Sequence, residues 1–237
     1  MSEVVCVCNN IKGRNASGLH SAWGLSILLR TGHEAILFDT GSDGGGLIAN
    51  LRALGIEISD IKKVVISHNH WDHTGGLRAL LTSSPGRIDV FLPPAKGGIS
   101  GDIEALAAGV TEVLDPMEIS PHVYSTGVIG KRIKEQALCV KTAGGLLMLA
   151  GCAHPGITRM VSAADRIFSD KVVSVLGGFH LEMHPSFVIR FFIRRLKNLG
   201  VAAVSASHCT GSAAISMFRS AFGSGFIEMN LGDVYRF

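Results

Sequence analysis

Three histidines and one aspartate stand within six residues of one another in the segment 66–76, the densest group of chemically active side chains in the sequence. His68 and His70 are two residues apart, so on an extended backbone their side chains point to the same side. Asp72 and His73 follow as the chain enters a loop. Imidazole and carboxylate groups together bind zinc, iron or manganese. Four such groups are more than one tetrahedral metal usually takes from one segment, so the motif predicts two metal ions.

Three further histidines share one sequence context, because each follows a predicted buried strand and precedes a predicted helix. His154, His180 and His208 stand after the apolar runs 146–150, 172–176 and 202–205. Strand ends in an α/β sheet gather at one edge, where loops form clefts. We therefore expect these side chains to join the motif of 66–76. The remaining four, His20, His33, His122 and His184, lack this context and are left out of the predicted site.

The rest of the chain alternates short apolar runs with amphipathic segments. Strands are expected over 4–7, 26–30, 35–39, 63–67, 87–92, 137–141, 146–150, 172–176 and 202–205, with short strands within 109–130 and an edge strand in the tail 226–234. Helices are expected between Ser42 or Asp43 and Gly55, over 103–108 and 157–168, between Pro185 and Gly200, and around Ala214 and Phe218. In the helix after Pro185, residues 188, 192, 196 and 199 are predicted to face inward. Glycine-rich residues 95–101 predict a loop. Strands alternating with helices indicate an α/β sandwich, and without a low-complexity linker we expect one domain over 1–237.

The composition favours a globular protein with a large apolar core. Hydrophobic residues make up 47% of the 237 residues and charged residues 17%, which is ample material for a dry core. The net charge is +3 and the basic residues are scattered, so no nucleic-acid partner is expected. No apolar run approaches the ~18 residues that a membrane span needs, and no secretory signal is visible. We expect a cytoplasmic protein without a membrane partner, and the oligomeric state stays open.

Five cysteines occur at spacings that form no disulfide framework: Cys6, Cys8, Cys139, Cys152 and Cys209. Such an odd set is typical of buried, reduced thiols in a cytosolic protein. Cys6 and Cys8 would share one face of a strand and could bind a metal, but there is no second Cys pair to complete a cysteine-type site.

Taken together, these motifs resemble a known superfamily. The pattern His-x-His-x-Asp-His-x-Gly-Gly, with the upstream Asp39-Thr40-Gly41 and single histidines at later strand ends, resembles the metallo-β-lactamase superfamily over nearly the whole chain. More narrowly, 37–41 (LFDTG), 151–156 (GCAHPG), 177–181 (GGFHL) and 208–211 (HCTG) resemble the branch named for dihydropterin-methyl-ribofuranosylaminobenzene-phosphate synthase, an enzyme of methanopterin biosynthesis. The resemblance implies an α/β, metallo-β-lactamase-like αββα four-layer sandwich.

The resemblance also implies roles for individual residues. It assigns two divalent metal ions, zinc with iron or manganese as alternatives, the first held by His68, His70 and His154 and the second by Asp72, His73 and His208. Asp39 would brace the metal loop through hydrogen bonds, and Asp72 and His180 would be catalytic. Superfamily members usually carry an aspartate that bridges the metals at the end of the strand 172–176. Here that strand runs into Gly177 and Gly178, and His180 is expected to take part of the missing role.

A metal-bound hydroxide would then attack an electrophilic carbon or phosphorus. This implies a hydrolase, or a condensation like that of the branch's synthase, on a small and possibly phosphorylated substrate. A metal-binding protein without turnover and a redox member of the superfamily are the alternatives. Redox members resemble His-x-Glu-x-Asp-His, whereas the third position here is His70.

Two features bear on the substrate. Thr210 and Gly211 open the last predicted helix, whose unpaired N–H groups suit an anion, and Gly211 would let a ligand approach closely; alternatively Thr210 only caps the helix. The branch has a histidine where Trp23 stands, and a His-Pro pair where Pro93 and Pro94 stand, so the substrate is expected to differ from that of the namesake.

Overall fold

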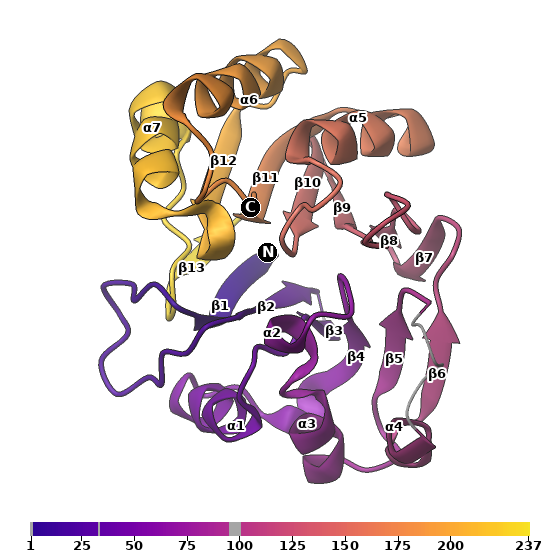
Figure 1. Cartoon of the computed structure of the whole chain (residues 1–237). Coiled ribbons are helices and arrows are strands. Elements are labelled where there is room, and N and C mark those ends of the chain that lie inside the picture. Colours follow the sequence, from indigo (N-terminus) through magenta and orange to yellow (C-terminus); the bar gives the residue numbers. More distant parts are fainter. Residues whose placement is uncertain (1, 33, 95–100) are drawn as a thin grey trace. The chain divides into compact units, whose positions relative to one another are not determined.

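The computed structural model describes residues 2–32, 34–94 and 101–237, and the chain divides into two compact units (Figure 1). Unit 1 comprises Met1–Leu114 and Met229–Phe237, and unit 2 comprises Asp115–Glu228. Each unit is built on one sheet with its own helices. The α/β class predicted from the sequence is confirmed, while the single domain over 1–237 stays a prediction. His33 and nearly all of the loop predicted over 95–101 lie outside the described residues.

Unit 1 contains a seven-stranded sheet in the order β13-β1-β2-β3-β4-β5-β6. Its strands are β1 (Glu3–Asn9), β2 (Leu25–Thr31), β3 (Glu34–Phe38), β4 (Ile61–Val65), β5 (Asp89–Leu92), β6 (Gly109–Glu112) and β13 (Val234–Arg236). β3, β4, β5 and β6 run parallel to one another, whereas β13, β1, β2 and β3 pair antiparallel. Parallel strands end at the same edge, so the residues after β3 and β4 lie together.

The described part of unit 1 contains four helices. They are α1 (Gly44–Ala53), α2 (Trp71–Thr74), α3 (Leu77–Ser83) and α4 (Gly101–Leu106), with a 3-10 turn at Ile58–Asp60. Leu47 and Leu51 of α1 and Leu80 of α3 pack in one core cluster with side chains of β2, β3 and β4. Each leucine buried in this way contributes about 1.5–3 kcal/mol. Asp43 caps α1 by accepting hydrogen bonds from the backbone N–H groups of Gly45 and Gly46.

Unit 2 contains a six-stranded sheet in the order β12-β11-β10-β9-β8-β7. Its strands are β7 (Met117–Ser120), β8 (Val123–Ser125), β9 (Leu138–Thr142), β10 (Gly145–Ala150), β11 (Val172–Gly178) and β12 (Ala203–Ser207). β10, β11 and β12 are parallel neighbours, and the others pair antiparallel. Its helices are α5 (Ile157–Phe168), α6 (Ser186–Asn198) and α7 (Ser212–Phe222), with 3-10 turns at His208–Thr210 and Gly223–Gly225. The helices lie along one face of this sheet (Figure 1).

Two details differ from the sequence-based expectation. The edge strand of the tail is β13, shorter and later than 226–234, because the tail first makes a turn in which Gly232 has φ +84°. Helix α6 buries Ile189, Ile193 and Leu196 rather than a stripe at 188, 192, 196 and 199, so the buried face is rotated by about one residue. Among the described residues, no helix is long and apolar enough to cross a membrane.

Candidate metal centre

One group of predicted ligands lies in unit 1, where β4 runs through a short loop into α2. His68 and His73 are fully buried and Asp72 nearly so, while His70 is exposed. His68 Nε2 lies 3.1 Å from His70 Nδ1, and Asp72 Oδ2 lies 3.6 Å from His73 Nε2. Two nitrogens bound to one tetrahedral zinc would be about 3.3 Å apart. Within this unit, the four side chains thus form the two pairs that the predicted ligand sets require, and their spacing fits metal binding.

Asp39, which follows β3, holds this arrangement through both carboxylate oxygens. Oδ1 accepts the backbone N–H of Ser67 at 2.6 Å, and Oδ2 accepts the Ser67 hydroxyl and the His73 Nδ1–H, each at 2.7 Å. Asp39 is fully buried and has φ +61°, a backbone conformation that non-glycine residues rarely adopt. These are the contacts expected of a residue that braces the loop.

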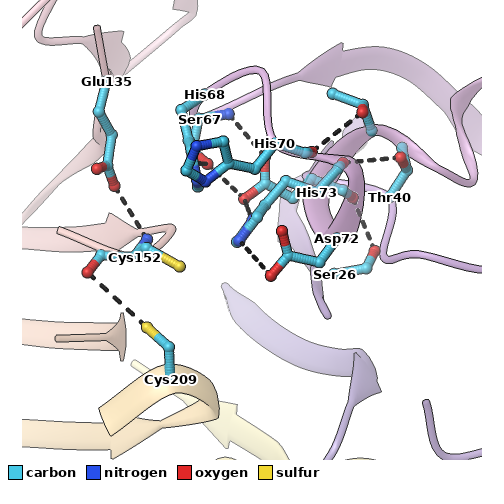
Figure 2. Close-up of polar contacts among 12 residues, drawn as sticks. Ser26, Thr40, Ser67, His68, His70, Asp72, His73, Glu135, Cys152 and Cys209 are labelled. Atoms are coloured by element: carbon cyan, nitrogen blue, oxygen red, sulfur yellow. Dashed lines mark hydrogen bonds and ion pairs between the residues drawn. The ribbon is translucent and has the colours of Figure 1, made fainter. Parts of the chain in front are cut away.

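The hydrogen bonds also fix which nitrogen of each buried imidazole carries the proton. Ser67 has one hydroxyl proton and gives it to Asp39, so its oxygen accepts from His68 Nδ1 at 2.9 Å. His73 Nδ1 likewise donates to Asp39. In both rings Nε2 therefore keeps its lone pair, as a metal ligand must. Thr40 and Ser26 anchor the surrounding backbone, through bonds to the carbonyl oxygens of His73 and Asp39 (Figure 2).

Trp23, noted in the sequence as a departure from the branch, contacts the predicted site directly. Its indole N–H donates to Asp72 Oδ2 at 3.1 Å, and its side chain is 42% exposed. Trp71, the residue before Asp72, is 63% exposed. Unit 1 thus presents two accessible indoles beside one predicted ligand.

Another group of predicted ligands lies in unit 2, at the edge where β10, β11 and β12 end. His154, His180 and His208 follow these strands, and the ring centroids of His154 and His180 are 4.5 Å apart. A residue with positive φ follows each strand, namely Ala153 (+56°), His180 (+51°) and His208 (+51°). Strained backbone of this kind persists where surrounding structure holds it, and it clusters at functional sites. The predicted edge is present within this unit.

Glu135, which the sequence did not single out, supports the loop that carries His154. Its buried carboxylate accepts the backbone N–H groups of Cys152 at 3.0 Å, Ala153 at 2.8 Å and His154 at 2.8 Å. Figure 2 shows the bond to Cys152. The sequence places Glu135 next to Lys134 in a basic, polar stretch, which is typical of a solvated loop. Only the fold reveals that it is buried.

No room exists for a carboxylate where β11 ends. A Cβ atom on Gly178 would lie 2.5 Å from the carbonyl oxygen of Gly151 and 2.7 Å from Cys209 Sγ. Gly177 is closer still to its neighbour, since a Cβ there would lie 1.9 Å from the carbonyl oxygen of Ala150. At the position where an aspartate was expected, the backbone therefore has no space for a side chain, and Cys209 Sγ occupies the adjoining space.

The cysteines separate into two kinds. Burial raises the pKa of the thiols of Cys6, Cys8 and Cys139, that of Cys8 to about 12, which fits inert core thiols. A hydrogen bond from the Cys152 side chain, with help from His180 and His208, lowers the pKa of Cys209 to about 4 despite its burial. Cys209 Sγ also lies 3.9 Å from the carbonyl oxygen of Cys152 (Figure 2). The sequence could not indicate this juxtaposition across 57 residues.

Thr210 has a different role from either one expected. It is fully buried, and its hydroxyl donates to the carbonyl of Ser207 and accepts the N–H of Phe179. Gly211, not Thr210, is the N-cap of α7, so the predicted cap role is wrong. A Cβ on Gly211 would lie 2.7 Å from Glu182 Cα, so protein backbone already makes the close approach that was expected of a ligand.

Comparison with known proteins shows which fold the chain shares. Residues 24–92 match the family model described as the metallo-beta-lactamase superfamily. The fold resembles that of a crystal structure described as a metal-dependent hydrolase of the beta-lactamase superfamily, with 26% identity, a TM-score of 0.83, and coverage of 100% of this chain and 99% of that one. It also resembles YhfI from Bacillus subtilis, a metallo-beta-lactamase fold protein, with 13% identity, a TM-score of 0.70 and full coverage of both chains. The chain therefore has the metallo-β-lactamase fold, and its residues 24–92 are similar to the superfamily's model.

The resemblance to one branch is confirmed as well. The chain is 29% identical over 284 residues to the 7,8-dihydropterin-6-methyl-4-(beta-D-ribofuranosyl)-aminobenzene-5'-phosphate synthase of Methanocaldococcus jannaschii, covering 99% of this chain and 96% of that protein.

Proposed function

We propose that this chain is a dinuclear metal-dependent enzyme that hydrolyses a small ester or phosphoester. One observation carries the proposal: two pairs of ligand atoms in unit 1 converge at metal-ligand spacing, with the Nε2 lone pairs of the buried His68 and His73 kept available. A polar surface loop would not need a buried carboxylate to fix the tautomers of two buried imidazoles.

The proposed ligand sets divide six side chains between two zinc ions. His68, His70 and His154 would hold the first ion, and Asp72, His73 and His208 would hold the second. Imidazole and carboxylate ligands of this number suit zinc, with iron or manganese as substitutes. When bound, such a pair supplies Lewis acidity and lowers the pKa of a bound water toward neutrality.

The protein's own groups have separate tasks in this proposal. Asp39 keeps His73 and, through Ser67, His68 in the required orientation. Trp23 fixes Asp72 Oδ2. In the proposal His180, which is exposed after the end of β11, would donate a hydrogen bond or a proton to the substrate.

A second candidate is a condensation like that of the related synthase. It is supported by the full-length similarity to that enzyme, whose name describes pterin and aminobenzene groups. The exposed indoles of Trp23 and Trp71 could stack on a planar ring of this kind. A substrate with a planar aromatic group should then show a higher KM with Trp71→Ala, at unchanged kcat.

The experiment is a screen of zinc-loaded protein against esters, phosphoesters, lactones and thioesters. His70→Ala should abolish turnover of any accepted substrate while leaving thermal unfolding of the metal-free protein unchanged, because His70 is exposed and the core of unit 1 does not include it. The matched control is His20→Ala, another exposed histidine of unit 1, which should keep full activity. Equal activity of His70→Ala and wild type at matched metal loading would refute the site.

A further inference from the structure

A third cluster of ligand groups lies within unit 2, outside the six histidine and aspartate ligands proposed above. Cys152 Sγ, Cys209 Sγ and a ring nitrogen of His180 lie within 4.8 Å of one another. The three residues come from the loops after β10, β12 and β11 respectively, so three parallel strands deliver them to one place.

The donor set defines the ligand class. Two cysteine sulfurs and one imidazole form the Cys₂His set of a zinc site with an open fourth position. Soft sulfur ligands favour zinc and its thiophilic analogues, such as cobalt and cadmium, over manganese and magnesium. We propose that Cys152, Cys209 and His180 bind a thiophilic divalent metal ion, with zinc as the natural occupant.

Both sulfurs are held in place by the surrounding structure. Glu135 fixes the backbone N–H of Cys152, and only 3% of Cys152 and 6% of Cys209 is exposed. The Cys209 sulfur sits against Gly178, at a distance that any side chain at 178 would disrupt. Its position therefore depends on the glycine that replaces the expected carboxylate.

His180 supplies the accessible side of the cluster. Unlike the sulfurs it is exposed, so the cluster is open to a metal ion on the side of His180. His180 has φ +51°, a backbone conformation that non-glycine residues rarely adopt. A metal bond to His180 is a physical reason for a histidine at this position.

This inference goes beyond the proposed function and can fail separately from it. A thiolate bound to cobalt(II) gives a charge-transfer absorption that histidine and aspartate ligands cannot give. Full-length protein, stripped with a chelator and kept in reductant, is therefore titrated with cobalt(II) alone. Wild type should develop the band with a single equivalent, and excess manganese(II) should not remove it.

Variants test whether the charge-transfer band comes from Cys152 and Cys209. Cys209→Ser and Cys152→Ser should each lose it along with one equivalent of bound cobalt, whereas Cys139→Ser, a buried cysteine of β9, should keep both. His180→Ala should keep a weaker band with at least a roughly tenfold lower affinity for cobalt. Because His180 is exposed, this variant carries little folding risk; circular dichroism verifies the fold of the cysteine variants.

Two results would overturn the proposal. One is a wild-type protein that shows no charge-transfer band at saturating cobalt. The other is a folded Cys209→Ser variant whose band equals that of wild type. Neither result would bear on the histidine and aspartate ligands, whose cobalt would still be found by elemental analysis.

Discussion

Both carboxylate oxygens of Asp39 accept hydrogen bonds from the loop that carries the proposed ligands. Removing this side chain should therefore weaken metal binding and lower stability. Asp39→Ala leaves the Ser67 N–H and the His73 Nδ1–H without their acceptor in a buried place. We expect a loss of about 1–3 kcal/mol in the free energy of unfolding for each buried group left unpaired. Zinc affinity should fall by about 10–100-fold, as for other groups that orient metal ligands.

Urea unfolding and competitive zinc titration measure the two effects. Asp43→Ala is the matched control, since Asp43 is also an aspartate of unit 1 that accepts backbone N–H groups, but at the start of α1. It should lose about 1 kcal/mol of stability and keep its zinc affinity. Equal zinc affinities of Asp39→Ala and Asp43→Ala would show that Asp39 does not support metal binding.

Residues differ in how much their sequence context reveals about their chemical role. His68, His70, Asp72 and His73 are adjacent in the chain, so their type and spacing alone predict the chemistry. Cys152 and Cys209 are far apart, and each looks like an ordinary core thiol until the fold brings them together. Thr210 shows the opposite error, because a hydroxyl next to a predicted helix suggests capping, whereas this one bonds the carbonyl of Ser207 and the N–H of Phe179.

At the scale of elements, the loop after β10 depends on a side chain from before β9. Glu135→Gln replaces one acceptor oxygen by an NH₂ group, which then faces a backbone N–H instead of accepting it. We expect a loss of about 1–3 kcal/mol in stability, and faster hydrogen exchange at the amides of Cys152, Ala153 and His154. The exposed Glu118 of β7 provides the control Glu118→Gln, in which these amides should exchange as in wild type. Unchanged exchange in Glu135→Gln would mean that the loop does not depend on the Glu135 carboxylate.

Elements were predictable where a local pattern dominates. Apolar runs flanked by glycine indicated β2, β3, β10 and β11, and the alternation of strands and helices indicated parallel strands with histidines at their ends. The face of α6 was not predictable, because apolar residues stand side by side in its sequence: Ile189 and Ile193 are buried, while the neighbouring Val188 and Phe192 are only half-buried. The tail strand was displaced because the turn at Gly232 depends on contacts with residues 11–13, which lie far away in sequence.

At the scale of the whole molecule, buried thiols should make stability depend on pH in the alkaline range. Burial raises the pKa of Cys139, so this thiol stays protonated in the native state while the unfolded chain ionises above about pH 8.5. The native state then binds more protons than the unfolded state, so its stability is complete below that pH and falls as the pH rises above it. Each such thiol contributes about 1.4 kcal/mol per pH unit.

Cys139→Ala therefore should show a shallower decline in unfolding free energy between about pH 9 and pH 10 than wild type, by about that amount per pH unit. The variant will also be less stable at every pH because a core side chain is shortened, so the slope is the readout. Parallel curves for the two proteins would show that Cys139 ionises alike in both states.

The central claim, that the histidine and aspartate ligands hold two metal ions, is tested most directly by the zinc content of Cys209→Ser protein. This background removes the proposed thiolate site and leaves the six other ligands intact. Elemental analysis after zinc loading and removal of free metal should give two equivalents per chain, and His68→Ala combined with His70→Ala should lower the value to one. A single equivalent in the Cys209→Ser protein that excess zinc cannot raise would contradict the dinuclear assignment.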